Sequence, residues 1–356
     1  ARNVQRLAEQ ALTWRPPHLA VLDEESAAKL RALLPADYRP RILVGSEGYA
    51  ELASLPEAST VLSAQMGAAG LRATMAAAEA GKVICLANKE SLVLAGGMLR
   101  ETCVRTGAVI LPVDSEHNAV FQGLRGRNPE TVRRIILTAS GGPFRGKKRG
   151  FLATVTPAQA LKHPNWSMGA KITIDSATLL NKGFEVIEAK WLYGAPLEKI
   201  HTVVQPESII HSLAEFDDGG ILAQMSYPSM ELPIQLALTY PQRFDCGLKP
   251  LDFEALGSIR FLPLERKRFP CYDLALSAAE AGDNYPCALN AAGEIAVGAF
   301  LKERIPFTAI AETIEDVLQK TERFPADAYE ALRETDARAR RAAEETIAER
   351  FSAKTK

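Results

Sequence analysis

Short β-branched runs alternate with helical stretches through the first 124 residues, and this alternation limits the fold more than any other feature of the sequence. The expected strands span residues 18–22, 41–44, 60–65, 82–87 and 108–113. Strands separated by helices at this spacing predict an α/β domain with a parallel sheet covered on both faces. Ligands bind beyond the carboxyl ends of such strands, so we expect the polar clusters at 67–70, 88–91 and 114–118 to face one crevice.

The pattern changes to a mixed α+β arrangement after about residue 134. We expect a strand over 135–140, an extended segment over 171–174, a helix over 178–193 and a hairpin with strands 208–216 and 221–226. Residues 241–270 are rich in proline and predict a linker, and helices follow with breaks near 283–286, 304–307 and 324–327. The predicted domains are therefore an α/β domain over 1–114, an α+β domain over 115–240, a linker over 241–270 and a helical bundle over 271–356.

Composition narrows the class of protein. Hydrophobic residues make up 47% of the 356 residues, which excludes disorder throughout, and a net charge of −1 gives no global field for a nucleic acid but does not exclude a local basic pocket. No apolar run reaches the ~18 residues of a membrane helix, so we expect a cytoplasmic protein without a membrane partner. The five cysteines are scattered without a CxxC pair, which predicts reduced and mostly buried thiols.

The segment Asp114-Ser115-Glu116 is the strongest local signal for chemistry. If it is extended, residues i and i+2 point the same way, so both carboxylates could bind one hard divalent cation such as Mg²⁺ or Mn²⁺. The alternative is a helix N-cap, because acidic residues are favoured in the first turn of a helix. The residues themselves leave both interpretations open.

The helix expected over 178–193 places Asn181, Glu185 and Glu188 on one face, at i, i+4 and i+7. A solvated face would explain this spacing equally well, and we favour that explanation for Glu188. Glu185 is the better functional candidate, because Lys182 and Asn181 precede it in a mixture suited to a polar ligand.

Several weaker signals accompany these carboxylates. Ser140-Gly141-Gly142 and Asp175-Ser176-Ala177-Thr178 combine small residues with hydroxyls that could bind an anion, although such segments are also common turns. Trp166 lies in a loop over 163–169 that could form a lid, or it could belong to the core. Lys89 could act as a catalytic or phosphate-pairing ammonium, although most lysines are merely solvated. His211 is expected to be a hydrogen-bonded strand residue.

Seven short motifs closely resemble the 1-deoxy-D-xylulose 5-phosphate reductoisomerase family. They are LANKES (86–91), PVDSEHN (112–118), SGGPF (140–144), HPNWSMG (163–169), DSAT (175–178), NKG (181–183) and ALNAA (288–292). They occur in the order typical of the family and span nearly the whole chain. The resemblance implies a Rossmann-like N-terminal domain, an α+β catalytic domain and a C-terminal helical bundle.

The resemblance also implies an activity. It indicates an enzyme that converts 1-deoxy-D-xylulose 5-phosphate into 2-C-methyl-D-erythritol 4-phosphate in non-mevalonate isoprenoid biosynthesis, by rearrangement and then hydride reduction. The implied cofactors are NADPH and a divalent metal, which would be Mg²⁺, Mn²⁺ or Co²⁺. The implied assembly is a homodimer formed through the sheet of the second domain.

By the same resemblance, the metal ligands are Asp114, Glu116 and Glu185, with Glu188 as a supporting or alternate ligand. The residues implied to contact the phosphosugar are Ser115, Glu116, Ser140, His163, Trp166, Ser176, Asn181, Lys182, Glu185 and Lys89. Those implied to line the NADPH site are Gly67, Asn88, Lys89, Glu90, Met168 and Gly169, with Arg2 and Asn3 at the adenosine end. Lys89, Asp114, Glu116, Glu185 and His163 are the implied catalytic residues.

The chain departs from the family pattern at its start and at two internal positions. The family carries a glycine-rich phosphate loop after its first strand, and this sequence begins later, so we expect the natural protein to have that segment. If the polypeptide begins at Ala1, we expect weak NADPH binding and an intact metal and phosphate site. Ala139 and Gln205 stand where glycine and histidine are expected. Two alternatives stay open: a metal-dependent phosphosugar isomerase or lyase without nicotinamide, and a non-catalytic scaffold.

Overall fold

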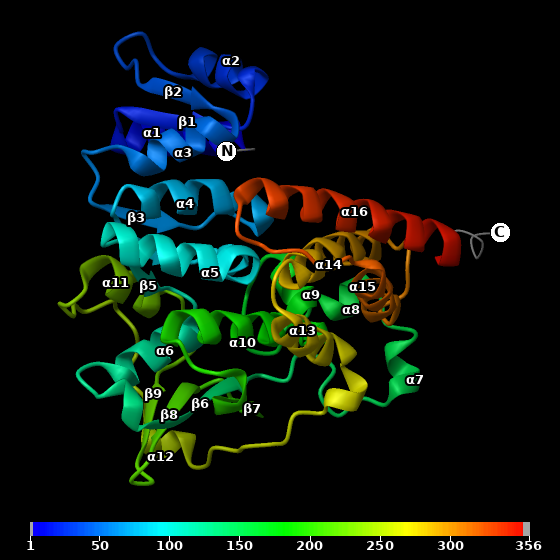
Figure 1. Cartoon of the computed structure of the whole chain (residues 1–356). Coiled ribbons are helices and arrows are strands. Elements are labelled where there is room, and N and C mark those ends of the chain that lie inside the picture. Colours follow the sequence, from blue (N-terminus) through cyan, green and yellow to red (C-terminus); the bar gives the residue numbers. More distant parts are fainter. Residues whose placement is uncertain (1–2, 352–356) are drawn as a thin grey trace. The chain divides into compact units, whose positions relative to one another are not determined.

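The structure is a computed structural model that describes residues 3–351, and their contacts group them into two compact units (Figure 1). Unit 1 comprises the residues up to Ser91 together with Leu99–Leu111. Unit 2 comprises Leu92–Met98 and the chain from Pro112 onward, which includes both the central sheet and the C-terminal helices. Helix α5, Lys89–Thr106, contributes residues to both units and is kinked at Ala95.

Unit 1 contains the five short strands that the sequence predicts. They are β1 His18–Val21, β2 Arg41–Val44, β3 Thr60–Ser63, β4 Val83–Leu86 and β5 Val109–Pro112. Within the described part of the chain they form two sheets, β1-β2 and β3-β4-β5, so the predicted parallel sheet is divided into two parts. The pairs β1-β2 and β3-β4 are parallel as expected. Pairing order depends on hydrogen bonds between distant segments, which hydrophobic periodicity does not specify.

The helices of unit 1 follow these strands. They are α1 Val4–Trp14, α2 Glu24–Leu33, α3 Gly45–Ser54, α4 Leu71–Glu79 and α5, with a 3₁₀ turn η1 at Gly67–Gly70. Asp23 is the N-cap of α2, because its side chain accepts a hydrogen bond of 2.8 Å from the backbone N–H of Ser26. The alternating strands and helices bury Val21, Ala27 and Leu30 in a common core.

The sheet of unit 2 has four strands in the order β7-β6-β8-β9. Their bounds are β6 Val132–Ala139, β7 Ile200–Val204, β8 Ile210–Phe216 and β9 Ile221–Met225. Strand β7 runs parallel to β6, whereas β8 and β9 are antiparallel to their neighbours. The predicted hairpin is confirmed, since the turn over 217–220 joins β8 to β9.

Helices make up most of the rest of unit 2. They are α6 Ser115–Leu124, α7 Arg149–Leu152, α8 Pro157–Ala160, α9 Ala170–Thr178, α10 Leu180–Tyr193, α11 Glu231–Thr239, α12 Phe253–Leu256, α13 Pro270–Ala281, α14 Tyr285–Leu301, α15 Ala309–Lys320 and α16 Tyr329–Phe351. Shorter 3₁₀ turns are η2 Pro129–Thr131, η3 Leu197–Lys199 and η4 Arg266–Arg268. The predicted breaks between the C-terminal helices agree with these bounds.

Two local expectations in unit 2 are wrong. Residues 171–174 are not extended but belong to α9, and the helix expected from Thr178 begins instead at Leu180. The two helices are separated at Leu179, whose φ of 61° is left-handed and whose N–H bonds to the carbonyl of Ser176. The β-branched residues of 171–174 favour a strand locally, but the side chains of Ile174 and Thr173 are buried in a helical arrangement that tertiary packing selects.

Two further properties of the described residues bear on the class of protein. None of the helices between residues 3 and 351 combines the length and the apolar composition needed to cross a bilayer. The five cysteines are free thiols, and Cys85, Cys271 and Cys287 are buried, which confirms the prediction of reduced and mostly buried cysteines.

Candidate active site

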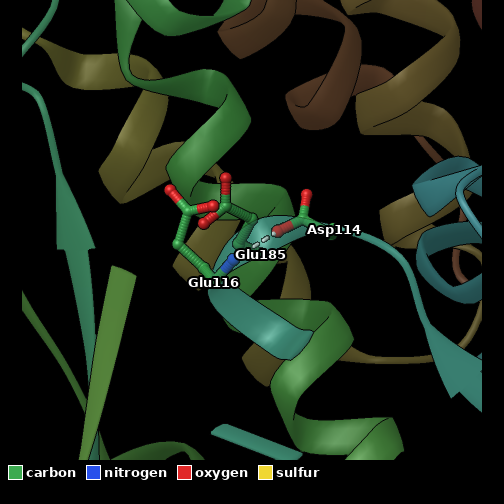
Figure 2. Close-up of side chains that lie close together, drawn as sticks. All are labelled: Asp114, Glu116 and Glu185. Atoms are coloured by element: carbon green, nitrogen blue, oxygen red, sulfur yellow. Dashed lines mark hydrogen bonds between the residues drawn. The ribbon is translucent and has the colours of Figure 1, made fainter. Parts of the chain in front are cut away.

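The carboxylates of Asp114, Glu116 and Glu185 converge in unit 2 (Figure 2). One oxygen from each side chain lies within 4.8 Å of the others, although Glu185 is distant from the other two in sequence. Asp114 and Glu116 come from the beginning of α6, and Glu185 comes from the middle of α10. The fold therefore brings together the three residues that the sequence motifs single out.

The start of α6 positions two of these carboxylates. Asp114 is the N-cap, and its side chain accepts a hydrogen bond of 3.2 Å from the N–H of Glu116. The Ser115 hydroxyl donates to Glu116 Oε2 at 2.5 Å. The segment is thus a helix start rather than the extended run expected from the strand before it. The N-cap interpretation and the carboxylate cluster are both correct, because a cap residue and the second residue of the first turn lie close together.

Helix α10 turns a polar face toward the interior of unit 2. Glu185 is 1% exposed and Glu188 is 2% exposed, so the expectation that Glu188 lies on a solvated face is wrong. Glu188 Oε2 lies 3.2 Å from Nε2 of the buried His117. Burial alone would lower the pKa of His117, but the Glu188 carboxylate outweighs it and raises that pKa. This buried pair connects α6 to α10 directly beside the carboxylate cluster.

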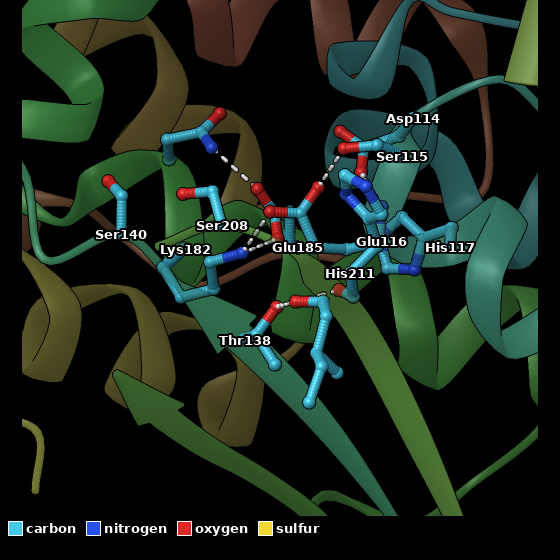
Figure 3. Close-up of polar contacts among 12 residues, drawn as sticks. Asp114, Ser115, Glu116, His117, Thr138, Ser140, Lys182, Glu185, Ser208 and His211 are labelled. Carbon is cyan, nitrogen blue, oxygen red and sulfur yellow. Dashed lines mark hydrogen bonds and ion pairs between the residues drawn. The ribbon is translucent and has the colours of Figure 1, made fainter. Parts of the chain in front are cut away.

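The ammonium of Lys182 lies among the carboxylates (Figure 3). Its Nζ is 2.8 Å from Glu116 Oε1 and also donates to Glu185 Oε2. Burial would lower the pKa of Lys182, but the Glu116 and Glu185 carboxylates raise it above its usual range, so the side chain stays charged. Asn181 donates to the other oxygen of Glu185 at 2.5 Å. Lys182 therefore neutralises part of the negative charge of the cluster.

The donor set suits a hard divalent cation. Carboxylate oxygens are the ligands that Mg²⁺ and Mn²⁺ prefer, and three of them from two helices lie close enough to share one ion. Such an ion would compete with the Lys182 ammonium for Glu116 and Glu185. The residues present thus fit a divalent metal, and they couple its binding to the position of one lysine.

A second polar group lies around Ser140, at the end of β6. His163 Nε2 is 3.1 Å from the Ser140 hydroxyl oxygen, which also accepts the N–H of Gly142 at 3.1 Å. His163 Nδ1 accepts the backbone N–H groups of Asn165 and Trp166 at 3.2 and 3.0 Å. Burial lowers the pKa of His163, which favours the neutral ring. An Nδ1 that accepts leaves the proton on Nε2, so His163 donates to Ser140.

Gly142 lets this serine approach α9. Its φ is +66°, and a Cβ at this position would lie 2.9 Å from the carbonyl oxygen of Ser176. Ser176 is half-buried in the last part of α9, rather than in the loop expected for residues 175–178. The loop after β6 and the end of α9 are therefore in close contact, which brings the two predicted hydroxyl segments together.

The loop over 163–169 is held in place by contacts of Trp166 and of its neighbour Asn165. The ring of the half-buried Trp166 packs edge-on against His211, with centroids 6.1 Å apart. Asn165 Nδ2 donates at 2.7 Å to Pro206 O and to Ser208 Oγ. His211 is hydrogen-bonded to Ser226, as predicted for a strand residue. Met168 is half-buried, and Gly169 is the exposed N-cap of α9.

Four residues with hydrogen-bonding roles in this region were given no function from the sequence. They are His117, Asn165, Ser208 and Gln205, whose buried amide accepts the N–H groups of Ile209 and Ile210. His117 lies inside the PVDSEHN motif, which could have drawn attention to it. Asn165 likewise lies inside the HPNWSMG motif. Ser208 and Gln205 make contacts around the turn before β8, for which the sequence contains no periodic signal.

The remaining candidates belong to unit 1 and are described within it. Asn88 Nδ2 donates to Gln65 O at 2.6 Å, to Gly67 O at 3.1 Å and to Glu90 Oε2 at 3.0 Å. Its side chain thus links the end of β3, the turn η1 and the start of α5. Lys89 and Glu90 are each 8% exposed. Asn3 is exposed and caps α1, and Arg2 lies outside the described residues.

Comparison with protein families gives three matches along the chain. A model described as 1-deoxy-D-xylulose 5-phosphate reductoisomerase matches residues 1–96. A model for the C-terminal domain of the same enzyme matches residues 110–193, and a further DXP reductoisomerase C-terminal domain model matches residues 225–342.

Individual relatives carry the same name. The chain is 58% identical over 325 residues to the 1-deoxy-D-xylulose 5-phosphate reductoisomerase of Oleidesulfovibrio alaskensis, covering 91% of this chain and 80% of the relative. It is 59% identical over 318 residues to that of Nitratidesulfovibrio vulgaris strain DP4, covering 89% and 78%.

Solved structures resemble this fold closely. The reductoisomerase of Zymomonas mobilis in complex with NADPH has a TM-score of 0.90 and 41% identity, over 97% of this chain and 89% of that one. A DOX-P reductoisomerase in complex with NADPH, fosmidomycin and magnesium has a TM-score of 0.91 and 40% identity, with the same coverage.

Proposed function

Because this chain belongs to the 1-deoxy-D-xylulose 5-phosphate reductoisomerase family, we infer that it catalyses the NADPH- and divalent-metal-dependent conversion of 1-deoxy-D-xylulose 5-phosphate into 2-C-methyl-D-erythritol 4-phosphate. The enzyme is an oxidoreductase of isoprenoid biosynthesis. The single observation in the molecule that carries this conclusion is the convergence of Asp114, Glu116 and Glu185 beside a group of hydroxyl, imidazole and ammonium side chains.

We propose that Asp114, Glu116 and Glu185 hold the divalent metal. When bound, the metal stabilises negative charge on substrate oxygens and NADPH supplies the hydride. Glu185 is oriented for this role by Asn181, and Glu116 by Ser115, so two ligands are fixed by hydrogen bonds to neighbouring side chains. Glu188 supports the site through His117, which fixes the spacing of α6 and α10.

We propose that the phosphate of the substrate binds between Ser140, Ser176, Asn181, Lys182 and His163. His163 donates to Ser140, and the Gly142 N–H donates to the same oxygen, so the Ser140 hydroxyl is free to direct its own proton at a phosphate oxygen. A cation that enters the carboxylate cluster would displace Lys182 from Glu116 and Glu185. The displaced ammonium would then neutralise the phosphate dianion.

Ser115 and Lys89 are proposed to contact the hydroxyl and carbonyl groups of the sugar, with Lys89 and His163 as catalytic groups that stabilise or transfer charge. Trp166 and Met168 are proposed to border the nicotinamide from a lid that excludes water. The half-buried position of Trp166 against His211 supports a lid anchored at its centre.

For NADPH we propose a binding domain over residues 1–114, with Gly67, Asn88, Lys89, Glu90 and Gly169 near the dinucleotide and Arg2 and Asn3 at the adenosine end. The hydrogen bonds of Asn88 to Gln65, Gly67 and Glu90 support this proposal, because they fix the backbone at the carboxyl ends of β3 and β4. The catalytic domain is proposed over 115–240, followed by the linker 241–270 and the helical domain 271–356.

We also propose a homodimer and a cytoplasmic location. Strand β9 is the edge of the sheet in unit 2, and its Ile221 and Leu222 side chains are exposed. An exposed apolar edge strand is suited to pairing with a second copy of the chain. Sedimentation velocity of the wild-type chain would test the dimer, and a monomer at micromolar concentration would contradict it.

Oxidation of NADPH in the presence of 1-deoxy-D-xylulose 5-phosphate and Mg²⁺ is the direct test of the activity. We expect turnover with the metal, loss of turnover with a chelator and recovery when Mg²⁺ or Mn²⁺ is added back. Product formed without NADPH would favour a phosphosugar isomerase or lyase, and binding without turnover would favour a scaffold.

A further inference from the structure

A concentrated basic patch lies on unit 2 beside the proposed phosphate pocket. It consists of Arg145, Lys147, Lys148, Arg149, Arg266, Lys267 and Arg268. These residues come from two segments far apart in sequence, one that leads into α7 and one that forms η4. In Figure 1 the green helix α7 lies near the yellow part of the chain that leads into α13.

Hydrogen bonds join the two segments. Arg268 donates to the carbonyl of Lys147, and the N–H of Gly146 donates to Glu265 Oε2 at 3.5 Å. Arg268 also pairs with Glu265. The side chains of Lys147, Lys148, Arg149, Arg266 and Lys267 are exposed. The basic patch is therefore one surface rather than two separate runs of charge.

The positive charge of the basic patch is only partly neutralised. The carboxylates paired within it are Glu265 with Arg268 and Asp273 with Arg266, the latter at 2.6 Å. Seven cationic side chains thus face two acidic partners. Since the whole chain has a net charge of −1, the rest of the molecule is net negative, and the patch stands out as a local source of positive potential.

The basic patch is continuous with the proposed phosphate pocket. Arg145 donates to the carbonyl of Ser140, whose hydroxyl is hydrogen-bonded to His163. Arg145, Glu265 and Gly141 also line one small cavity of about 200 Å³. A dianion that approaches from the side of the patch would pass several cationic side chains on the way to Ser140.

We propose that the basic patch captures the phosphorylated substrate electrostatically and directs its phosphate into the Ser140 pocket. This inference rests on the proposed function, because it assigns the patch to the same phosphosugar. The exposed lysines and arginines act at a distance and do not touch the bound substrate. Their effect therefore appears in the KM for the substrate and in its salt dependence, whereas kcat is set by the groups that contact the substrate.

The test uses the full chain with Lys148→Gln, Arg149→Gln and Lys267→Gln combined, because these three side chains are exposed. If the three charges are taken to act from about 12 Å, they change the binding of a dianion about tenfold at ~0.01 M ionic strength and about twofold at ~0.15 M. We therefore expect KM for 1-deoxy-D-xylulose 5-phosphate to rise by about these factors, with kcat within about twofold of wild type. We expect the inhibition constant of inorganic phosphate, as a competitive inhibitor, to rise together with this KM.

The matched control neutralises the exposed cations Lys302, Arg333 and Arg341 by substitution with glutamine. This variant has the same net charge as the test variant, and we expect its KM and salt dependence to follow wild type. Equal KM values for the two triple variants at low salt would overturn the proposal. Absence of turnover by the wild-type chain would instead contradict the proposed function, so the two failures are distinguishable.

Discussion

Lys182 Nζ lies 2.8 Å from Glu116 Oε1, inside the group of carboxylates proposed to bind the metal. The same ammonium donates to Glu185. Because a divalent cation and an ammonium cannot both occupy this position at low cost, metal binding and the position of Lys182 are linked. The lysine is one of the residues proposed to meet the substrate phosphate, so the linkage extends to substrate binding.

Substitution of Lys182 by methionine should strengthen metal binding and weaken substrate binding. The ammonium that competes for Glu116 and Glu185 is removed, so we expect Mn²⁺ affinity without substrate to rise by about tenfold. KM for the phosphosugar should rise by at least about tenfold, because a charge-assisted hydrogen bond is lost. Calorimetric titration with Mn²⁺ measures the first effect, with Lys171→Met as a control in which a half-buried lysine that pairs with Asp175 is lost instead. Weaker Mn²⁺ binding would contradict the competition.

Glu185→Gln should impair metal binding far more than Glu188→Gln. Both carboxylates are buried on α10, but only Glu185 shares a position with Asp114 and Glu116. We expect Mn²⁺ affinity to fall by at least about a hundredfold for Glu185→Gln and by about tenfold or less for Glu188→Gln. Electron paramagnetic resonance of free Mn²⁺ measures both. The reverse order would identify Glu188 as the ligand.

The neutral His163 ring should carry its proton on Nε2. Its Nδ1 accepts two backbone N–H groups, at Asn165 and Trp166, which excludes a proton there. The chain contains five histidines, so ¹⁵N-histidine labelling gives a simple spectrum. The resonances of His163 are those that disappear in a His163→Gln variant. We expect a pyridine-like Nδ1 resonance and a pyrrole-like Nε2 resonance at pH 8. A proton on Nδ1 would refute the proposed orientation of Ser140.

His211 should make folding stability depend on pH. Burial lowers its pKa below the value of about 6.5 for an unfolded histidine, so the unfolded state binds more protons as the pH falls. The contribution of His211 to stability is therefore present at neutral pH and lost below about pH 6.5. We expect the free energy of unfolding to fall more between pH 7 and pH 5 in wild type than in His211→Gln. Parallel curves from urea denaturation would refute this.

Most of the fold could be predicted from hydrophobic patterning. The five strands of unit 1, the β8-β9 hairpin and the C-terminal helices follow from periodicity and turn residues, which are local signals. The order in which the strands pair within β1-β2 and β3-β4-β5 does not follow from periodicity, because it depends on hydrogen bonds between distant segments. The β-branched segment 171–174 was assigned wrongly because burial in α9 outweighs its local preference.

The three carboxylates of the site could be predicted from sequence motifs, but the contacts that support them could not. Asp114 and Glu116 stand two residues apart, and Glu185 follows from resemblance to a family. Glu188 was assigned to a solvated face because helical spacing alone cannot distinguish a polar face in water from one that packs on a buried histidine. The position of Lys182 within the carboxylates likewise depends on a contact between α6 and α10.

Gly142 restricts how this sequence can vary. A hydrogen atom is the largest substituent that its φ of +66° and the 2.9 Å gap to the Ser176 carbonyl admit. We consider a library in which codon 142 is randomised, in cells whose growth depends on this enzyme. Only variants with glycine at this position should be recovered. At Gly146, where a Cβ would meet nothing within 4 Å, asparagine and other residues that tolerate positive φ should survive. Evolutionary freedom along this loop is therefore set by its distance from a neighbouring helix.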